Sequence, residues 1–237
     1  MEHSCQKDIK KTILVIVAHP DDEVLGCGAS ISKWAAEGNE VHILIMAEGE
    51  TSRDSLRNRS AKSEELFQLN KAAQQAGSLL GASSVSLLNF PDNRMDSLDR
   101  LDVIKAIETE ITRLDPYMVV THHCGDLNID HQIIHESVIV ACRPQPGCNV
   151  RRLLAFEVVS STEWQSVAWG KNFIPNWFED ISKHIDIKIE ALKIYDSEMR
   201  KYPHARSLQN VENLARLRGC SVGFDAAEGF MLLRELA

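Results

Sequence analysis

The sequence predicts an α/β fold: a three-layer parallel sheet with strand order near 3-2-1-4-5, followed by an elaborated C-terminal half. Two observations support this prediction. Between residues 12 and 142, apolar runs of strand length alternate with stretches of helical periodicity, which is typical of successive βα units with right-handed crossovers. The first run, residues 13–18, is aliphatic throughout, as expected of a strand that is buried on both faces.

The first half of the chain supplies four strand–helix pairs. Gly38 and Gly81 end the first two helices, because glycine readily adopts the left-handed conformation that closes a helix, and Pro116 and Pro144 stop the other two. The expected strands are Thr12–Ala18, Glu40–Ala47, Val85–Leu88 and Tyr117–Thr121, and the expected helices are Val24–Glu37, Arg57–Leu80, Leu98–Leu114 and Asp130–Cys142.

The pattern changes after Arg151. The expected strands are Leu153–Val159, Phe173–Trp177 and Phe230–Leu233, and the expected helices are Ser182–Arg200 and one that ends near Leu217. Because residues 143–150 are too few for a flexible linker between domains, we expect a single domain over residues 1–237. Its core would span residues 12–158 and its C-terminal elaboration residues 159–237.

Composition excludes several classes of partner. A chain of 237 residues with 44% hydrophobic content can bury one sizeable core. A net charge of −8 without a basic run argues against nucleic acid and anionic membranes. The polar N-terminus lacks the apolar segment of a signal peptide, and no apolar run is long enough to span a membrane. Six cysteines without a CxxC pair indicate reduced thiols in a cytoplasmic protein. The sequence leaves open whether the chain forms a homo-oligomer.

Two polar loops are expected to meet. In an open parallel sheet, ligands bind at the carboxyl ends of the strands, where the strand order reverses. In the order 3-2-1-4, the first and fourth strands are neighbours at that point, so the loops that follow them lie together. The first loop carries His19, Asp21 and Asp22, and the second carries His122, His123, Asp126, Asp130 and His131.

This combination of side chains favours a divalent metal. A catalytic zinc site takes about three protein ligands, usually histidine and carboxylate, and His19, Asp22 and His131 fit that set. A metal-bound water becomes a nucleophile at neutral pH, and Asp21 is the candidate base for its proton. The structural alternatives are a helix cap with a buried His19–Asp22 hydrogen bond and a solvent-facing His131. Asp130 would either cap its helix or orient a neighbouring group.

Residues 19–28 (HPDDEVLGCG) and 125–131 (GDLNIDH) resemble the motifs of the PIG-L/LmbE-type N-acetylsugar deacetylases, in the expected order. The resemblance covers at least residues 13–142 and implies a zinc-dependent hydrolase on a Rossmann-like sheet. It implies His19, Asp22 and His131 as ligands of Zn²⁺, with Fe²⁺ as the alternative metal, and Asp21 as general base. Residues 160–164, 203–207 and 227–230 are similar to the branch associated with bacterial surface-polysaccharide sugars.

The chain departs from the family pattern in two places. Many relatives have His-Pro-Asp-His, whose first histidine stabilises the oxyanion or protonates the amine, and here that position is Asn128. Asn128 is therefore a candidate catalytic residue, with His204 and His123 as alternatives. The relatives' Arg-x-x-Glu signature before the Leu-Gly turn is replaced by Leu69 and Ala72, which removes the substrate contacts expected from that helix.

Further polar residues predict the rim of a sugar site. Arg53, Asp92 and Arg94 follow the second and third strands on the same face of the sheet, and sugar hydroxyls need such convergent polar groups; ordinary loop solvation is the alternative. His123 and Arg206 complete the predicted substrate-binding set. Three tryptophans could stack on a sugar ring, although core packing is expected for at least two of them: Trp164, Trp169 and Trp177.

The expected function is removal of an N-acetyl group from a small-molecule amino sugar or sugar conjugate. One alternative is a metal hydrolase of a non-sugar N-acyl amine or ester at the same site. The other is a non-catalytic sugar- or nucleotide-binding module, which would need no metal. The sequence leaves open which sugar is used and whether it is free, nucleotide-linked or lipid-linked.

Overall fold

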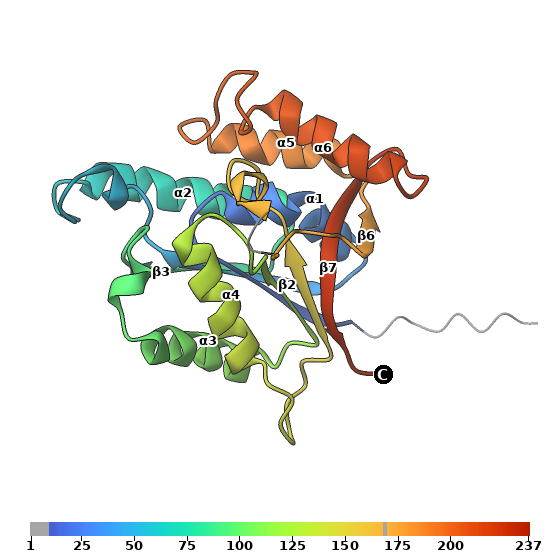
Figure 1. The fold of residues 1–237 in the computed structure, drawn as a ribbon, viewed down its shortest axis with the longest axis horizontal. Coiled ribbons are helices and arrows are strands. Elements are labelled where there is room, and N and C mark those ends of the chain that lie inside the picture. Colours follow the sequence, from blue (N-terminus) through green and yellow to red (C-terminus); the bar gives the residue numbers. More distant parts are fainter. Residues whose placement is uncertain (1–9, 168–169) are drawn as a thin grey trace, which may run out of the picture.

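A computed structural model describes residues 10–167 and 170–237 and contains one seven-stranded sheet with helices on both faces (Figure 1). The strand order is β3-β2-β1-β4-β5-β7-β6, which confirms the predicted fold class and extends the predicted sheet by two strands. The strands are β1 (Thr12–Val17), β2 (Glu40–Ala47), β3 (Ser84–Phe90), β4 (Met118–His122), β5 (Arg152–Phe156), β6 (Trp177–Asp180) and β7 (Ala227–Glu235). The first five are parallel, and β7 pairs antiparallel with both β5 and β6.

The helices divide between the two faces of the sheet. They are α1 (Asp22–Ala36), α2 (Ser63–Leu79), α3 (Arg100–Leu114), α4 (Ile129–Ala141), α5 (Ile185–Ile194) and α6 (Leu208–Cys220). Alternation along β1 explains the division, because successive side chains of a strand point to opposite faces. Val15 belongs to the core shared with α1 and α2, whereas Ile16 belongs to the core shared with α3 and α4. Helix α5 lies over α1 and α2, and α6 lies beside it (Figure 1).

Several predicted elements have wrong boundaries. The strand predicted over Leu153–Val159 ends at Phe156, and the strand predicted over Phe230–Leu233 extends from Ala227 to Glu235. Three others differ more. The strand predicted over Phe173–Trp177 begins only at Trp177, after Pro175, which has no N–H for a strand ladder. The helix predicted from Arg57 begins at Ser63, because residues 57–59 fold back and their arginines bind Glu48. The helix predicted over Ser182–Arg200 is limited to Ile185–Ile194.

Gly26 and Gly28 both serve packing, but toward different neighbours. A Cβ at Gly26 would lie 2.3 Å from the ring of Phe156 on β5, so glycine permits close contact between α1 and the sheet. A Cβ at Gly28 would instead meet Val24 and Lys188, the latter on α5. Between these glycines, Cys27 has non-helical dihedral angles and kinks α1.

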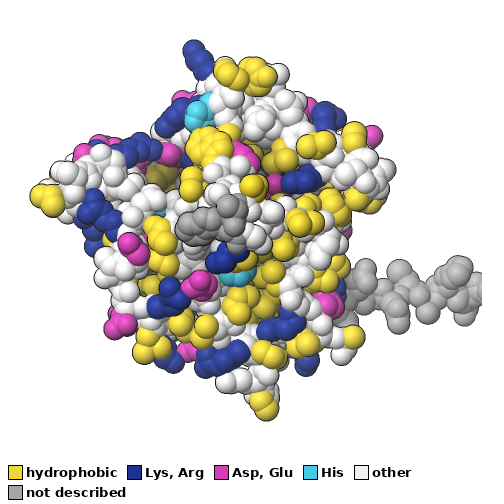
Figure 2. All heavy atoms as spheres, viewed as in Figure 1, with side chains coloured by type: hydrophobic (Ala, Val, Ile, Leu, Met, Phe, Trp, Pro, Cys, Tyr) yellow, Lys and Arg dark blue, Asp and Glu magenta, His cyan; other side chains and the backbone are white. Residues whose placement is uncertain are grey.

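The surface carries both signs of charge (Figure 2). On the face drawn in Figure 2, Lys and Arg side chains are interspersed with Asp, Glu and apolar side chains, and the described residues form no continuous basic patch there. None of the described helices has the length and apolar character needed to cross a membrane. The N-terminal segment, Cys5 and Trp169 lie outside the described residues.

Candidate active site

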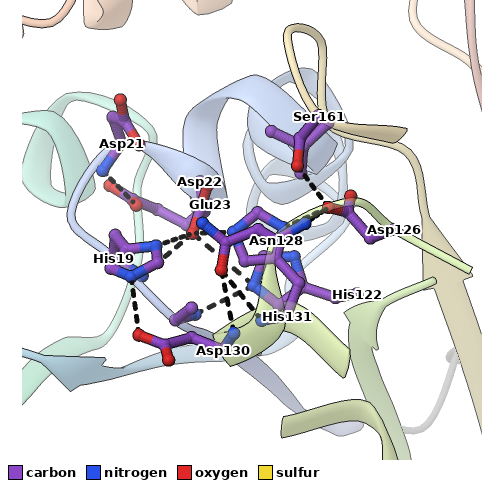
Figure 3. A network of polar contacts seen from close by, with 12 residues as sticks. His19, Asp21, Asp22, Glu23, His122, Asp126, Asn128, Asp130, His131 and Ser161 are labelled. Atoms are coloured by element: carbon purple, nitrogen blue, oxygen red, sulfur yellow. Dashed lines mark hydrogen bonds and ion pairs between the residues drawn. The ribbon is translucent and has the colours of Figure 1, made fainter. Parts of the chain in front are cut away.

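The two predicted polar loops meet at the carboxyl ends of β1 and β4, which are neighbours in the sheet (Figure 3). His19 lies in the loop that follows β1, and His131 lies in the first turn of α4. Their ring centroids are 5.4 Å apart, and Asp22, at the start of α1, lies between them. Asp22 Oδ2 is 3.3 Å from His19 Nδ1 and 3.2 Å from His131 Nε2. The sheet topology thus brings residues 112 positions apart into one cluster of nitrogen and oxygen donors.

A carboxylate stands behind each imidazole. Asp130 Oδ2 lies 3.0 Å from His19 Nε2, and Asp126 Oδ1 lies 3.1 Å from His131 Nδ1. The nitrogen that each ring presents to Asp22 is therefore the one that its backing carboxylate does not engage. This is the arrangement by which proteins select the tautomer and orientation of metal-binding histidines.

Both backing carboxylates are held in place. Asp130 accepts hydrogen bonds from the backbone N–H groups of Asn93 (2.7 Å) and Met95 (3.0 Å), so the loop after β3 supports it. Asp126 accepts from the hydroxyl groups of Thr162 (2.6 Å) and Ser161, which belong to the C-terminal half. Asp130 thus orients a neighbour instead of capping α4, and the capping residue is Asn128.

The electrostatics of the cluster favour charge compensation. Burial alone raises the pKa of Asp22, but His131 and His122 lower it well below its usual value. Burial lowers the pKa of His131, yet Asp22 and Asp126 raise it to about 9. His19 behaves in the same way: burial lowers its pKa, but Asp130 and Asp22 raise it well above the usual value. The carboxylates therefore attract a positive charge to the centre of the cluster.

A divalent metal fits His19, Asp22 and His131. Their donor atoms all lie within 4.8 Å of one another. Asp22 Oδ1 and His131 Nε2 are buried and have no hydrogen-bond partner within residues 10–167 and 170–237, as expected of atoms meant for an ion. A second set, His19 with Asp92 and Asp130, meets the same distance limit. Both carboxylate oxygens of Asp92 and of Asp130 already accept hydrogen bonds, whereas Asp22 Oδ1 has no partner in the described part of the chain, so the first set fits a metal better.

Asp21 differs from Asp22 in both backbone and partners. Its φ of 109° and ψ of −29° place it in a left-handed conformation that is strained for a non-glycine residue, and its side chain does not cap α1. Asp21 Oδ2 accepts a hydrogen bond of 2.6 Å from Arg206 Nη1, whereas its buried Oδ1 lacks a partner in the described part of the chain. The two aspartates point in different directions in Figure 3. Burial raises the pKa of Asp21 to about 8, although Arg206 opposes this shift.

Two supporting residues were missed at the sequence level. Glu23 Oε2 accepts from the backbone N–H of Asp21 (3.0 Å), and Glu23 Oε1 accepts from the hydroxyl of Tyr195 (2.6 Å). Burial raises the pKa of Glu23 to about 7, and the Tyr195 hydrogen bond acts against this rise. Glu23 stands in the predicted motif, but no local pattern marks Tyr195, which reaches the site only because the C-terminal end of α5 packs near α1.

His122 also takes part without having been assigned a role. It is fully buried, its Nε2 accepts a hydrogen bond of 2.8 Å from the Ala18 N–H, and its ring stacks on His131 with centroids 3.8 Å apart. Burial holds the pKa of His122 well below its usual value. The sequence signal that could have identified His122 is its position at the end of β4, next to the polar loop that contains His123 and His131.

A polar cavity of about 170 Å³ opens beside this cluster. Of the predicted site residues, its lining includes His19, Asp21, Arg53, Asp92, Asn128 and Arg206. The Asn128 side chain caps α4: Oδ1 accepts from the N–H groups of Asp130 and His131, so Nδ2 is the end left to donate, and it donates to Asn93. This capping fixes the orientation of the Asn128 amide.

Five predicted site residues lie outside the lining: the buried Asp22 and His131 of the cluster described above, and three others. Arg94 donates to the carbonyl groups of Asp54 and Ser55 and so supports the loop after β2. His123 is buried and contacts the carbonyl group of Lys171. His204 is exposed, accepts from the Arg206 N–H, and lies edge-on to Trp164, which is 54% exposed.

Comparisons with known proteins identify relatives of this chain. The chain matches the PIG-L family model, described as GlcNAc-PI de-N-acetylase, over residues 14–142. It is 32% identical over 194 residues to the uncharacterized deacetylase YaiS of Escherichia coli (strain K12), covering 79% of this chain and 92% of the relative. It is 25% identical over 202 residues to diacetylchitobiose deacetylase of Thermococcus kodakarensis, covering 81% and 71%. The solved structure of N,N′-diacetylchitobiose deacetylase from Pyrococcus horikoshii has the same fold, with a TM-score of 0.76, 20% identity and coverage of 94% and 84%.

Proposed function

This chain belongs to the PIG-L family, and on that premise we propose that it is a metal-dependent hydrolase that removes an N-acetyl group from an amino sugar or sugar conjugate. One observation carries the proposal. Two imidazoles, each backed by its own carboxylate, turn their remaining nitrogens toward Asp22, and the cavity beside them is lined by a second aspartate. The curated relatives that span most of the chain are named as deacetylases, and one is named for a chitin-type disaccharide.

His19 Nδ1, Asp22 and His131 Nε2 would hold the metal, with Zn²⁺ as the expected ion and Fe²⁺ as the alternative. A divalent ion bound there would polarise the acetyl carbonyl group and lower the pKa of a water molecule toward neutrality. The roles of Asp130 and Asp126 are to keep both rings in the ligating orientation.

Asp21 is the proposed general base. Arg206 engages Asp21 Oδ2, which leaves Oδ1 to take the proton from the attacking water. The water oxygen bonds to the acetyl carbon, the carbon–nitrogen bond breaks, and the amine nitrogen receives the proton that Asp21 took up. The products are acetate and a free amino sugar.

Asn128 is the proposed donor to the negative charge that develops on the acetyl oxygen. Asn128 lines the cavity, and the helix cap fixes the orientation of its amide, so little reorganisation is needed when that charge appears. His204 is the alternative acid for the leaving amine, because it accepts a hydrogen bond from the backbone N–H of Arg206, which lines the cavity. Arg53, Asp92 and Arg206 would supply the polar rim, while Arg94 and His123 would act on substrate only through the loops that they support.

Metal analysis combined with an acetate-release panel tests the proposal. Purified protein is assayed for zinc and iron, and acetate release is followed with N-acetylated sugars, N-acetyl amino acids, acylated thiol conjugates and simple esters. We expect stoichiometric metal and release from the sugars. Metal with turnover only of non-sugar substrates would support the hydrolase alternative. Absence of both metal and turnover would support a binding module.

A further inference from the structure

The charged side chains of the cavity are unequally balanced. Besides His19, the described residues of its lining include four carboxylates and two arginines: Asp21, Glu50, Asp92, Glu198, Arg53 and Arg206. A site built for a phosphate or carboxylate usually offers an arginine whose donors are free to bind the anion in a bidentate way. The partners of the two arginines therefore decide which charge the cavity accepts.

Arg53 is already engaged by two glutamates. Its Nη2 donates to both carboxylate oxygens of Glu198, at 2.7 and 2.9 Å, and its Nη1 lies 2.8 Å from Glu50. The side chains of Glu198 and Glu50 are only 13% and 8% exposed, whereas Arg53 is 48% exposed. The partly buried glutamates thus hold the arginine at the cavity rim with its charge compensated.

Arg206 is engaged as well. Its Nη1 donates to Asp21 at 2.6 Å, and its Nε donates to the hydroxyl group of Ser160 at 2.7 Å. Glu198 Oε2 lies 3.9 Å from the same Nη1, so Glu198 stands between the two arginines. A metal bound to Asp22 would leave these pairs intact, since none of their atoms belongs to the ligand set.

We infer that this cavity selects uncharged or amine-bearing sugars and discriminates against sugars that carry a phosphate or carboxylate next to the acetamido group, with Glu198 and Glu50 as the specificity-determining residues. The inference deepens the proposed function and rests on it for the identity of the sugar. An anion entering the cavity would lie beside four carboxylates and would have to break the bidentate ion pair with Glu198 to reach Arg53. Hydroxyl groups and the ammonium group of a deacetylated product meet no such barrier.

The test compares binding of two deacetylated probes that differ in one charged group: methyl α-glucosaminide and α-glucosamine 1-phosphate. Dissociation constants are measured calorimetrically on the metal-loaded full chain at low and high salt, because a charge effect weakens with ionic strength. We expect the phosphate to bind at least tenfold more weakly. Glu198→Gln should reduce the ratio of the two dissociation constants roughly fivefold, and the double variant Glu50→Gln with Glu198→Gln should reduce it further.

Glu190→Gln is the matched control, since Glu190 lies on α5 in an exposed pair with Lys193, away from the cavity lining; it should leave the ratio unchanged. Equal or tighter binding of the phosphate by the wild type would overturn the inference. So would a ratio unaffected by either glutamate variant, or no binding of methyl α-glucosaminide. Acetate release from the N-acetylated forms is followed in parallel. Weaker binding of the phosphate probe without any acetate release would contradict the proposed function but would still support charge selection by the cavity.

Discussion

Arg206 Nη1 lies 2.6 Å from Asp21 Oδ2, which joins residues 185 positions apart in the chain. Asp21 follows β1 in the first βα unit, whereas Arg206 lies between α5 and α6 in the C-terminal elaboration. The elaboration is therefore part of the candidate site, because it supplies the cation that accompanies the strained aspartate. Tyr195 and Ser161 make the same kind of connection to Glu23 and Asp126.

Replacing Asp21 should separate metal binding from turnover. Asp21→Asn retains the size of the side chain, and asparagine tolerates the left-handed backbone conformation of this position. We expect acetate release to fall by roughly 10²- to 10⁴-fold, the usual contribution of a general base, while metal content stays stoichiometric. Asp22→Asn should instead lose the metal. If Asp21→Asn lost the metal and Asp22→Asn kept it, the two roles would be reversed.

The Arg206–Asp21 ion pair should matter for catalysis more than for folding. Arg206→Ala removes the cation beside Asp21 and the hydrogen bond to Ser160, so we expect kcat to fall roughly 10- to 100-fold. Arg206→Lys should recover part of the loss, because it keeps the charge without the guanidinium fork. Arg216→Ala is a suitable control, since Arg216 pairs with Glu212 at the exposed surface of α6. Equal kcat values for the alanine variant and wild type would contradict this role.

Asp126 should control metal affinity without touching the metal. Asp126→Asn replaces the carboxylate that orients His131 and accepts from Thr162. We expect the dissociation constant for Zn²⁺, measured by competition with a chelator, to rise roughly 10- to 100-fold. As a control, Asp180→Asn at the exposed end of β6 should leave the dissociation constant for Zn²⁺ unchanged. An unchanged affinity in Asp126→Asn would show that the ring of His131 is oriented by packing alone.

A buried ion pair bridges the kink in α1 and should be important for stability. Lys188 Nζ donates to the Leu25 carbonyl group (2.9 Å) and to Glu228 (2.6 Å), and Glu228 accepts from the N–H groups of Ala29 and Ser30. The pair thus satisfies backbone groups that the kink at Cys27 leaves free. Both side chains are 4% exposed, so removing one leaves an uncompensated buried charge.

We therefore expect Lys188→Met to lower the free energy of unfolding by about 3–5 kcal/mol in urea titrations. The double variant Lys188→Met with Glu228→Gln should lose less than the sum of the two single variants, because the partners are coupled. Strict additivity would argue that the two residues act separately.

His135 should make the metal-free protein sensitive to acid. Burial lowers its pKa below the ordinary value of 6.5, with His123 and Lys171 acting in the same direction and the His122 carbonyl group and Glu136 opposing. The unfolded chain therefore binds a proton at a pH where the folded chain does not. This contribution to stability is complete above pH 6.5 and is lost as the pH falls through the lowered pKa.

The measurement is the free energy of unfolding of the metal-free protein between about pH 5 and pH 8, for the wild type and for His135→Gln. Glutamine can still donate to the His122 carbonyl group, which His135 Nδ1 now contacts at 2.8 Å. The variant should show a shallower loss of stability below pH 6.5. A parallel profile would mean that His135 does not contribute to acid sensitivity.

Much of the site could be predicted because the relevant signals are local. The apolar run ending at His19 marks a buried strand, and the chirality of βα units places its loop beside the loop that contains His131. His19, Asp22 and His131 do converge, and the metal is proposed on that geometry. The element boundaries that failed depend on longer-range contacts: Arg57 turns back to Glu48, which no helical periodicity records.

The sequence by itself determined the sheet, the order of its first five strands and the meeting of two polar loops, because apolar patterning and crossover handedness act over neighbouring segments. Only the tertiary structure decided that Arg206 pairs with Asp21, that Tyr195 supports Glu23, and that Glu198 occupies Arg53. These contacts depend on how α5 and the loops after it pack against the first half of the fold. That packing arises from the shapes of whole surfaces, which no short stretch of sequence encodes.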